Sequence, residues 1–160
     1  MLRALPASPD LRDLKIPKEV IPMNKVIIKA LLCLPLPILT LILEFLPSGA
    51  IYNVAEEPGE VLLETFSYFD TTYFGTTNFA PFFTAVATCV ALLLLGVYCA
   101  TRWYWFANAA KHFVFGGVVF AVMPLLFAVH TFPAVGAWIA GSLIAELALI
   151  HFLVGEPKKE

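Results

Sequence analysis

The fold of this chain is decided by residues 113–154, FVFGGVVFAVMPLLFAVHTFPAVGAWIAGSLIAELALIHFLV, a run of 42 residues whose only charged side chain is Glu146. A helix needs about 20 apolar residues to cross a hydrocarbon core of ~30 Å, so the run is long enough for two crossings. The segment 130–133 (HTFP) is where we expect the chain to reverse, because proline and the residue before it disfavour a continuing α-helix. The sequence therefore predicts two antiparallel spans, near 110–130 and 133–154.

Two further spans precede this pair. One covers about 26–46 and ends at a Pro-Ser-Gly sequence, and the other covers about 79–101, with Pro81 in its first turn, where a missing N–H costs least. We therefore predict an all-α fold, a four-helix transmembrane bundle with a partly structured outer loop at 47–78. The predicted organisation is a cytoplasmic N-terminal tail (1–24), a four-span domain (25–154) and a cytoplasmic C-terminal tail (155–160).

The composition indicates the same class. Hydrophobic residues make up 60% of the 160 residues and charged residues only 14%, and the mean hydropathy is +0.84. No charged residue lies between Asp70 and Arg102. These features exclude a soluble globular protein, a disordered chain and a nucleic-acid-binding protein. We therefore expect the chain to lie in a lipid bilayer and not to bind nucleic acid.

The basic residues lie on one predicted side of the membrane. They precede or open the first span, flank the loop between the second and third spans, or lie in the tail: Arg3, Arg12, Lys15, Lys18, Lys25, Lys29, Arg102, Lys111, Lys158 and Lys159. The 47–78 loop carries five acidic residues and no basic one. By the positive-inside rule, we expect a multi-pass protein of the cytoplasmic (cell) membrane with both termini cytoplasmic.

The first span has a second interpretation. Lys25 and Lys29, an apolar run of about 14 residues and then Ser48-Gly49-Ala50 are also typical of a signal peptide with its cleavage site. We favour an uncleaved anchor, because Glu44 and several prolines are unusual in a cleavable signal. Residues 1–22 are then either a cytoplasmic tail or an over-extended reading frame.

Glu146 is the candidate functional residue. It lies eight residues before Val154, which places it about 12 Å below the inner surface of the membrane. An ionised carboxylate at that depth is costly, and the other spans offer no cation there. We expect a protonated Glu146 that hydrogen-bonds across a helix interface, with Tyr98 as the nearest donor. The alternatives are a Glu146 that couples proton exchange to a solute and a Glu146 that is simply exposed to water. Glu44, near the outer end of the first span, is expected to reach headgroup water.

Small residues predict where helices approach closely. They recur every four positions in the fourth span, the small-xxx-small pattern, and a shorter counterpart occurs in the third span. We expect these two faces to meet, with a serine on the stripe that carries the buried carboxyl. The predicted helix-packing residues are Gly117, Ala121, Ala137, Gly141, Ser142 and Ala145.

The outer loop contains a second candidate surface. Segment 60–69 (EVLLETFSYF) places apolar residues on one helical side and two glutamates on another. Together with the aromatic residues that follow, this pattern indicates a segment that lies on the membrane and caps the bundle, as simple packing, a partner surface or a lid. The residues of this predicted surface are Glu64, Ser67, Tyr68, Phe69, Asp70 and Asn78.

No sequence motif for a cofactor or a metal is present. Cys89 and Cys99 are ten residues apart, which separates them by about 15 Å along a helix and excludes a disulfide between them. His112 and His130 are expected at opposite membrane surfaces, so they cannot share a haem or a metal. HExxH, GxSxG and phosphate-binding glycine loops do not occur. We therefore predict no cofactor and no metal.

The stretch from Leu43 to Pro81 carries a resemblance to other proteins. It resembles a group of small, uncharacterised four-span membrane proteins of Gram-positive (Firmicutes-type) bacteria and covers about a quarter of the chain. The residues that carry it are Glu44, Leu46, Pro47, Gly49, Ser67, Tyr68, Phe69, Gly75, Asn78, Phe79 and Pro81. The resemblance implies a bacterial cytoplasmic membrane and four helices, and it supplies no activity.

Three functions follow as hypotheses. The first is a non-enzymatic accessory or interaction subunit that packs as a homo-oligomer or with a membrane partner subunit. The alternative is a small proton-coupled transporter of a lipophilic or cationic solute that uses Glu146. The third, an enzyme acting on lipid, requires Ser67, Asp70 and Asn78 to converge on one pocket.

Overall fold

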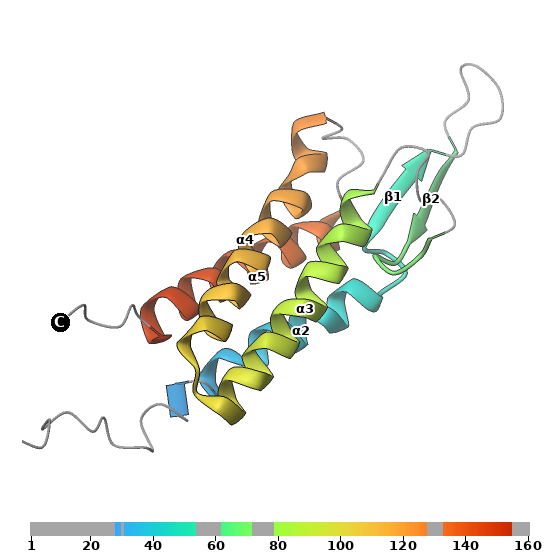
Figure 1. Cartoon of the computed structure of the whole chain (residues 1–160). Coiled ribbons are helices and arrows are strands. Elements are labelled where there is room, and N and C mark those ends of the chain that lie inside the picture. Colours follow the sequence, from blue (N-terminus) through green and yellow to red (C-terminus); the bar gives the residue numbers. More distant parts are fainter. Residues whose placement is uncertain (1–27, 30, 54–61, 72–78, 128–132, 155–160) are drawn as a thin grey trace, which may run out of the picture.

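The structure, a computed structural model, describes residues 28–29, 31–53, 62–71, 79–127 and 133–154. Its elements, in chain order, are α2 (Pro35–Phe45), β1 (Ala50–Asn53), β2 (Leu63–Phe66), α3 (Ala80–Thr101), α4 (Tyr104–Phe127) and α5 (Ala134–Val154) (Figure 1). Most of the described residues are therefore helical, as predicted.

Three of the described helices are long and apolar enough to cross a membrane: α3, α4 and α5. The prediction of a mostly helical chain with long apolar helices suited to crossing a membrane is confirmed at this level. The fourth is a shorter apolar helix, Leu31–Phe45, which includes α2. It is interrupted at Leu34, where Pro35 has no N–H to continue the helical hydrogen bonds.

The connection between α3 and α4 is tighter than expected. α3 ends at Thr101, and Arg102 adopts a left-handed conformation (φ 59°) in which its N–H donates to the carbonyl of Tyr98 at 2.7 Å. The chain thus reverses within two residues, and α4 begins at Tyr104 rather than near residue 110. As a result the aromatic residues that follow Trp103 belong to the first turn of α4. The helix continues through Pro124.

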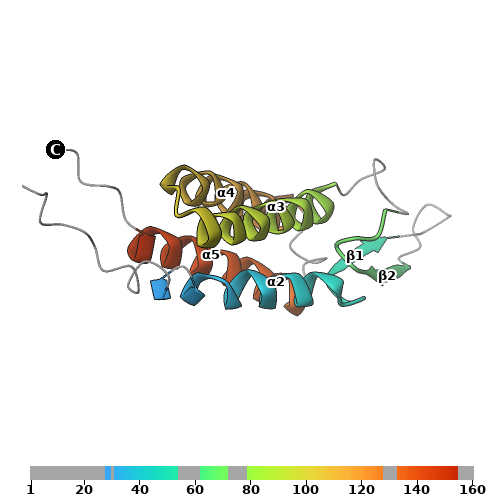
Figure 2. The ribbon, with the colours of Figure 1, turned by 60° about the horizontal axis from the view of Figure 1, so that its bottom comes forward.

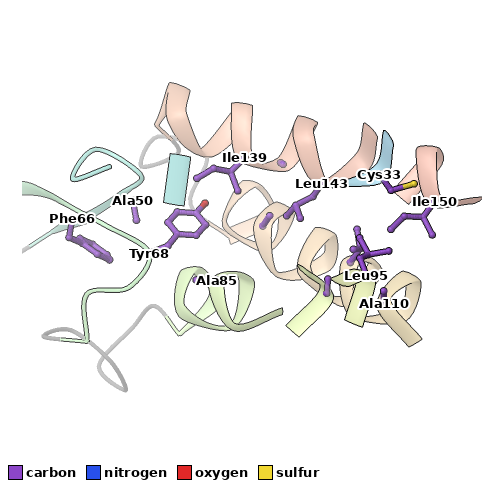
Figure 3. Packing of buried hydrophobic residues seen from close by; sticks show 14 residues of the cluster. Cys33, Ala50, Phe66, Tyr68, Ala85, Leu95, Ala110, Ile139, Leu143 and Ile150 are labelled. Atoms are coloured by element: carbon purple, nitrogen blue, oxygen red, sulfur yellow. The ribbon is translucent and has the colours of Figure 1, made fainter. Parts of the chain in front are cut away.

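The four helices form two layers. Figure 2 shows α3 and α4 in one layer and α2 and α5 in the other. The core between them extends from Ala50 and Phe66 through Ile139 and Leu143 to Ile150 (Figure 3). On the outside, large apolar side chains such as Leu93, Leu126 and Phe152 are exposed, as expected for helices that contact lipid.

Strands β1 and β2 form a β-hairpin, and β2 occupies part of the segment 60–69, whose residue pattern indicated a helical face. β1 pairs with β2 in an antiparallel register that sets Ala50 opposite Phe66 and Asn53 opposite Leu63. The hairpin lies beyond the end of α2 and the start of α3 (Figure 1). The helical pattern was a wrong indication because pairing with β1 satisfies the backbone hydrogen bonds of Leu63–Phe66. The Thr and Phe residues of this run also suit a strand. The fold is thus mostly helical with one small sheet, rather than all-α.

The segment after β2 docks on the end of α2. The Tyr68 N–H donates to the carbonyl of Glu44 at 3.0 Å, and the ring of Phe69 stacks on Phe45 with centroids 4.3 Å apart. Tyr68 is buried and its ring lies so close to Gly49 that a Cβ there would approach it to 3.0 Å. Gly49 therefore allows the loop to cover this end of the bundle.

Candidate functional site

Polar side chains line the inside of the bundle between α2, α3 and α5. We call five of them the polar seam: Thr40, Glu44, Thr88, Ser142 and Glu146. Four of the five are fully buried, and Ser142 is half-buried. Buried hydroxyl and carboxyl groups in apolar helices are rare, because each costs free energy unless it finds a hydrogen-bond partner.

The centre of the seam is a contact between two hydroxyl groups. The Thr40 Oγ1 donates to Ser142 Oγ at 2.8 Å, which joins α2 to α5. Ser142 in turn donates to the carbonyl of Ile139 at 2.8 Å. Each hydroxyl lies four residues from a glutamate on the same helix, Glu44 or Glu146, so each pair shares a helix face.

Glu44 occupies the end of the seam nearer the hairpin. The Thr88 hydroxyl of α3 donates to Glu44 Oε1 at 2.7 Å. The second oxygen, Oε2, is buried and has no hydrogen-bond partner among the described residues. Tyr68 lies close enough to interact with this carboxyl electrostatically. Burial, and then Glu44, raises the pKa of the Tyr68 phenol above its ordinary value.

Glu146 occupies the other end. Within the described part of the chain, neither of its carboxyl oxygens has a hydrogen-bond partner. The expected donor Tyr98 is therefore not bonded to it; Tyr98 packs instead in a separate cluster with Ala107. The thiol of Cys33 on the neighbouring helix lies within electrostatic reach of Glu146.

The two carboxyls lie at different depths. α2 and α5 are antiparallel, since Gly49 after α2 contacts Gly136 at the start of α5 and Thr40 contacts Ser142 further along. Four residues correspond to about 6 Å of helix, so the two glutamates lie about 12 Å apart along the axis, on either side of the hydroxyl pair. They remain close enough to interact electrostatically.

Among the described residues, no cation compensates the seam. Within the described ranges, the lysines and arginines are Lys29, before α2, Arg102, between α3 and α4, and Lys111 of α4. The start of α2 and the α3–α4 connection lie at the end of the bundle away from the hairpin (Figure 1). Burying an ionised carboxylate without a partner cation is far more costly than burying a neutral acid. The surroundings of Glu44 and Glu146 therefore favour protonated carboxyl groups.

Gly117 and Ala121 of the predicted packing face lie inside the bundle, and both are buried. A Cβ on Gly117 would meet Ala87 at 3.5 Å and Leu143 at 3.7 Å, so α4 approaches both α3 and α5 there. Ser142 is also at a helix contact, but with Thr40 of α2 rather than with α4.

The stripe predicted on the fourth span does not face α4. Ala137, Gly141 and Ala145 are exposed, and nothing lies within 4 Å of a Cβ built on Gly141. The physical reason is that the larger apolar residues Ile139 and Leu143 fill the core. The contact of Ser142 with α2 then leaves the small residues on the outside of α5.

The predicted outer surface is only partly a surface. Glu64 and Asp70 are exposed, Ser67 and Phe69 are half-buried, and Tyr68 is buried under the loop. Tyr68 is thus a core residue, because its ring fills the space beside Gly49. Asn78 lies outside the described residues. The predicted meeting of Ser67, Asp70 and Asn78 in one pocket, which an enzyme acting on lipid requires, therefore also lies outside them.

Sequence reasoning missed the role of Glu44. It was expected to reach headgroup water, yet its side chain is 0% exposed. The signal was present as a pair of polar residues four apart on an apolar helix, Thr40 and Glu44, matched by Thr84 and Thr88 on α3. That pattern does not show that Glu44 is buried, because its burial depends on the folded loop, in which Tyr68 covers this end of the bundle.

The three cysteines of the chain, Cys33, Cys89 and Cys99, are free. Within the described ranges, no group of three or more His, Cys, Asp or Glu side chains is placed to hold a metal ion. Comparison of the chain with protein-family models, curated proteins and solved structures finds no match.

Proposed function

We propose that the chain is a small proton-coupled membrane transporter in which Glu44 and Glu146 bind and release protons as a solute moves. The observation that carries the proposal is the burial of two carboxyls without a cation, with three of their oxygens lacking a partner among the described residues. Ionisable residues inside a membrane bundle commonly belong to ion and proton pathways.

A purely structural role explains the seam less well. A buried polar atom that lacks a hydrogen bond costs about 1–3 kcal/mol, and an apolar residue of similar volume at Glu146 would pack without that cost. The Thr40–Ser142 hydroxyl pair lies between the two carboxyls and supplies a polar link along the bundle axis. An acidic interior without basic residues also favours a cationic or lipophilic solute over an anion.

The proposal includes four membrane crossings, with α2 as part of the first. Helix Leu31–Phe45 spans only about 22 Å, against a hydrocarbon core of ~30 Å. In the sequence, the five residues before it, 26–30 (VIIKA), are apolar except for Lys29, so residues 26–45 supply the roughly 20 residues that a crossing needs. Its packing along α5 through Thr40 supports a helix that crosses with the others.

The proposal also includes an orientation, with both termini in the cytoplasm. Trp103 and Trp105, whose rings are exposed, and the described lysines and arginines belong to the segments around the start of α2, the α3–α4 connection and the first part of α4. These segments lie toward the end of the bundle opposite the hairpin (Figure 1). Lys and Arg are enriched on the cytoplasmic side, and Trp is enriched at membrane interfaces. Exposed Glu64 and Asp70 are then on the outside.

The transport experiment uses the full chain in proteoliposomes with ethidium, a fluorescent lipophilic cation, as the probe. An imposed pH gradient is expected to drive ethidium across the membrane in the wild type. We expect Glu146→Gln and Glu44→Gln to reduce the initial rate at least tenfold, because an amide cannot exchange a proton. The matched control Glu64→Gln, on the exposed hairpin, should keep the wild-type rate. Transport by Glu146→Gln at the wild-type rate would overturn the proposed coupling.

Infrared difference spectra between acidic and alkaline buffer test the protonation step without a solute. The wild type should show the carbonyl stretch of a buried protonated carboxyl that changes with pH, and Glu146→Gln should lose part of it. A wild-type spectrum without any such pH-dependent band contradicts proton exchange at the seam. Circular dichroism and gel filtration of each variant establish that it is folded.

A second candidate, a non-enzymatic accessory or interaction subunit, is favoured by the outer face of α5. Trp138 there is 71% exposed, beside the exposed small residues Ala137, Gly141 and Ala145. Such a face permits close approach of another helix, from a second copy or from a partner subunit. Co-purification in mild detergent tests this function, and repeated recovery of a lone monomer counts against it.

A further inference from the structure

Two basic side chains from different helices meet at the end of the bundle opposite the hairpin. Lys111 of α4 and His151 of α5 approach with Nζ and Nδ1 3.1 Å apart. They border a pocket whose lining residues come from α4 and α5. Figure 1 shows that the start of α4 and the end of α5 lie at the same end of the bundle. The lining residues of the pocket, here called the basic pocket, are Tyr104, Ala107, Asn108, Lys111, Ile150, His151 and Val154.

The polar groups of the basic pocket are suited to an anion. Lys111 contributes an ammonium, and Asn108 contributes an amide. The pocket also lies beside the first turn of α4, a 24-residue helix that begins at Tyr104. The N-terminal end of a helix carries a partial positive charge and free N–H groups, which favour phosphate and carboxylate groups.

The described carboxyls do not compensate these basic groups. Glu44 and Glu146 are buried in the polar seam, and Glu64 and Asp70 lie on the hairpin side. A lysine ammonium can only donate, so in the 3.1 Å contact the Nδ1 of His151 accepts from Lys111 and the ring proton is on Nε2. A bound phosphate oxygen would accept from a second N–H of the ammonium, a charge-assisted hydrogen bond, and from the Nε2–H of the imidazole.

The surroundings of the basic pocket indicate where the anion comes from. Its volume is about 10 Å³, which holds roughly one water-sized group, so an anion binds at the mouth rather than inside. Around this end, Trp105 is 64% exposed and Phe152 is 80% exposed. Exposed tryptophan is typical of the headgroup level of a bilayer. Exposed apolar side chains beside the mouth suit the acyl chains of a lipid.

We infer that the basic pocket is a binding site for the phosphate of an anionic phospholipid headgroup, held by Lys111 and His151 with Asn108 as a further donor. This inference does not depend on proton coupling, but it rests on the membrane crossings and the orientation included in the proposed function. Basic pockets between helices at the cytoplasmic side of membrane proteins are suited to anionic headgroups, and the site joins α4 to α5 through one shared ligand.

The experiment measures the thermal stability of the full chain in a neutral detergent as phosphatidylglycerol is titrated in. The wild type is expected to be stabilised in a saturable manner, whereas phosphatidylcholine at the same concentrations gives a markedly smaller shift. Lys111→Gln and His151→Gln should each weaken the apparent affinity for phosphatidylglycerol about tenfold, equivalent to about 1.4 kcal/mol. Lys111→Arg, which retains the charge, should bind within a few-fold of the wild type.

Two controls make the outcome decisive. Lys29→Gln removes a basic residue that is exposed and lies outside the basic pocket, and it should leave the affinity unchanged. In a parallel titration, inorganic phosphate replaces the lipid. If phosphate stabilises the wild type and Lys111→Gln abolishes this effect, the basic pocket binds the phosphate group alone. If phosphate does not stabilise the wild type, binding requires the whole lipid.

The inference is overturned if phosphatidylglycerol does not stabilise the wild type, or if Lys29→Gln and Lys111→Gln weaken binding equally. Equal loss would mean that general charge at this end of the bundle, and not the pocket, attracts the lipid. If Lys111→Gln is poorly folded, the comparison of His151→Gln with Lys111→Arg gives the same decision.

Discussion

The hydrogen bond between Thr88 and Glu44 gives the sharpest prediction about the polar seam. Thr88→Val keeps the shape of the side chain but removes the hydroxyl that donates to Glu44 Oε1 at 2.7 Å. Because Glu44 Oε2 already lacks a partner among the described residues, the variant leaves both oxygens of the buried carboxyl unpaired.

The expected loss of unfolding free energy follows from two ranges of values. Leaving a buried polar atom without its partner costs about 1–3 kcal/mol in soluble proteins. Measured interhelical hydrogen bonds in membrane proteins average ~0.6 kcal/mol and reach ~1.7 kcal/mol. The bond is short and both groups are 0% exposed. We therefore expect Thr88→Val to lower the free energy of unfolding by about 1–2 kcal/mol, near the upper end of the membrane range.

The chain offers a matched control one turn away on the same helix. Thr84 is also fully buried, but its hydroxyl donates only to the carbonyl of Ala80 at 2.9 Å. That carbonyl also accepts the helical N–H bond, so Thr84→Val should cost less than about 0.5 kcal/mol. Equilibrium unfolding in mixed micelles of a mild detergent and sodium dodecyl sulfate measures both variants.

A double-mutant cycle isolates the contact. In a Glu44→Met background, the cost of Thr88→Val should fall to that of Thr84→Val, because no carboxyl remains to be left unpaired. Equal costs for the two threonine variants in the wild-type background would refute the reasoning. So would a cost of Thr88→Val that is unchanged by Glu44→Met.

Two other predictions concern packing and pH. Gly117→Leu should destabilise the bundle by about 1–3 kcal/mol through overpacking, because a Cβ at this position already meets Ala87 at 3.5 Å. The control Gly116→Leu should be nearly neutral, because nothing lies within 4 Å of a Cβ built there. Equal shifts in the melting temperature of the two variants would contradict this prediction. Burial, and then Glu44, raises the pKa of Tyr68 above its ordinary value of 10.0, so its neutral phenol stabilises the fold fully below about pH 10 and loses this contribution as the pH rises further. Tyr68→Phe should therefore flatten the alkaline decrease in melting temperature, and an unchanged slope would count against the burial of the phenol.

The positions of two of the long helices were predicted closely from the sequence. Apolar runs, uncharged at 79–101 and interrupted only by Glu146 at 133–154, predicted helices there, and the structure has Ala80–Thr101 and Ala134–Val154. The reason is local, because in lipid the backbone must satisfy its own hydrogen bonds within each helix. The start of α4 was missed by six residues, since the left-handed turn at Arg102 has no glycine to mark it.

The candidate site was only half predictable. Glu146 was identified because a charge in an apolar run is visible without any partner. Glu44 was misplaced because its burial depends on Tyr68, a residue that β2 and the following turn bring over the end of α2. The outward stripe of α5 was misassigned for the same reason: small residues permit close approach, but which side of a helix packs depends on its neighbours.

The sequence by itself determined that the chain is built from apolar helices suited to lipid and that at least one carboxyl lies inside them. These properties follow from hydropathy and length, which each segment carries alone. The tertiary structure decided that Thr40 meets Ser142, that Thr88 meets Glu44 and that Lys111 meets His151. Such contacts depend on how each helix is rotated about its axis, and helices that are apolar on all sides carry almost no sequence signal for that rotation.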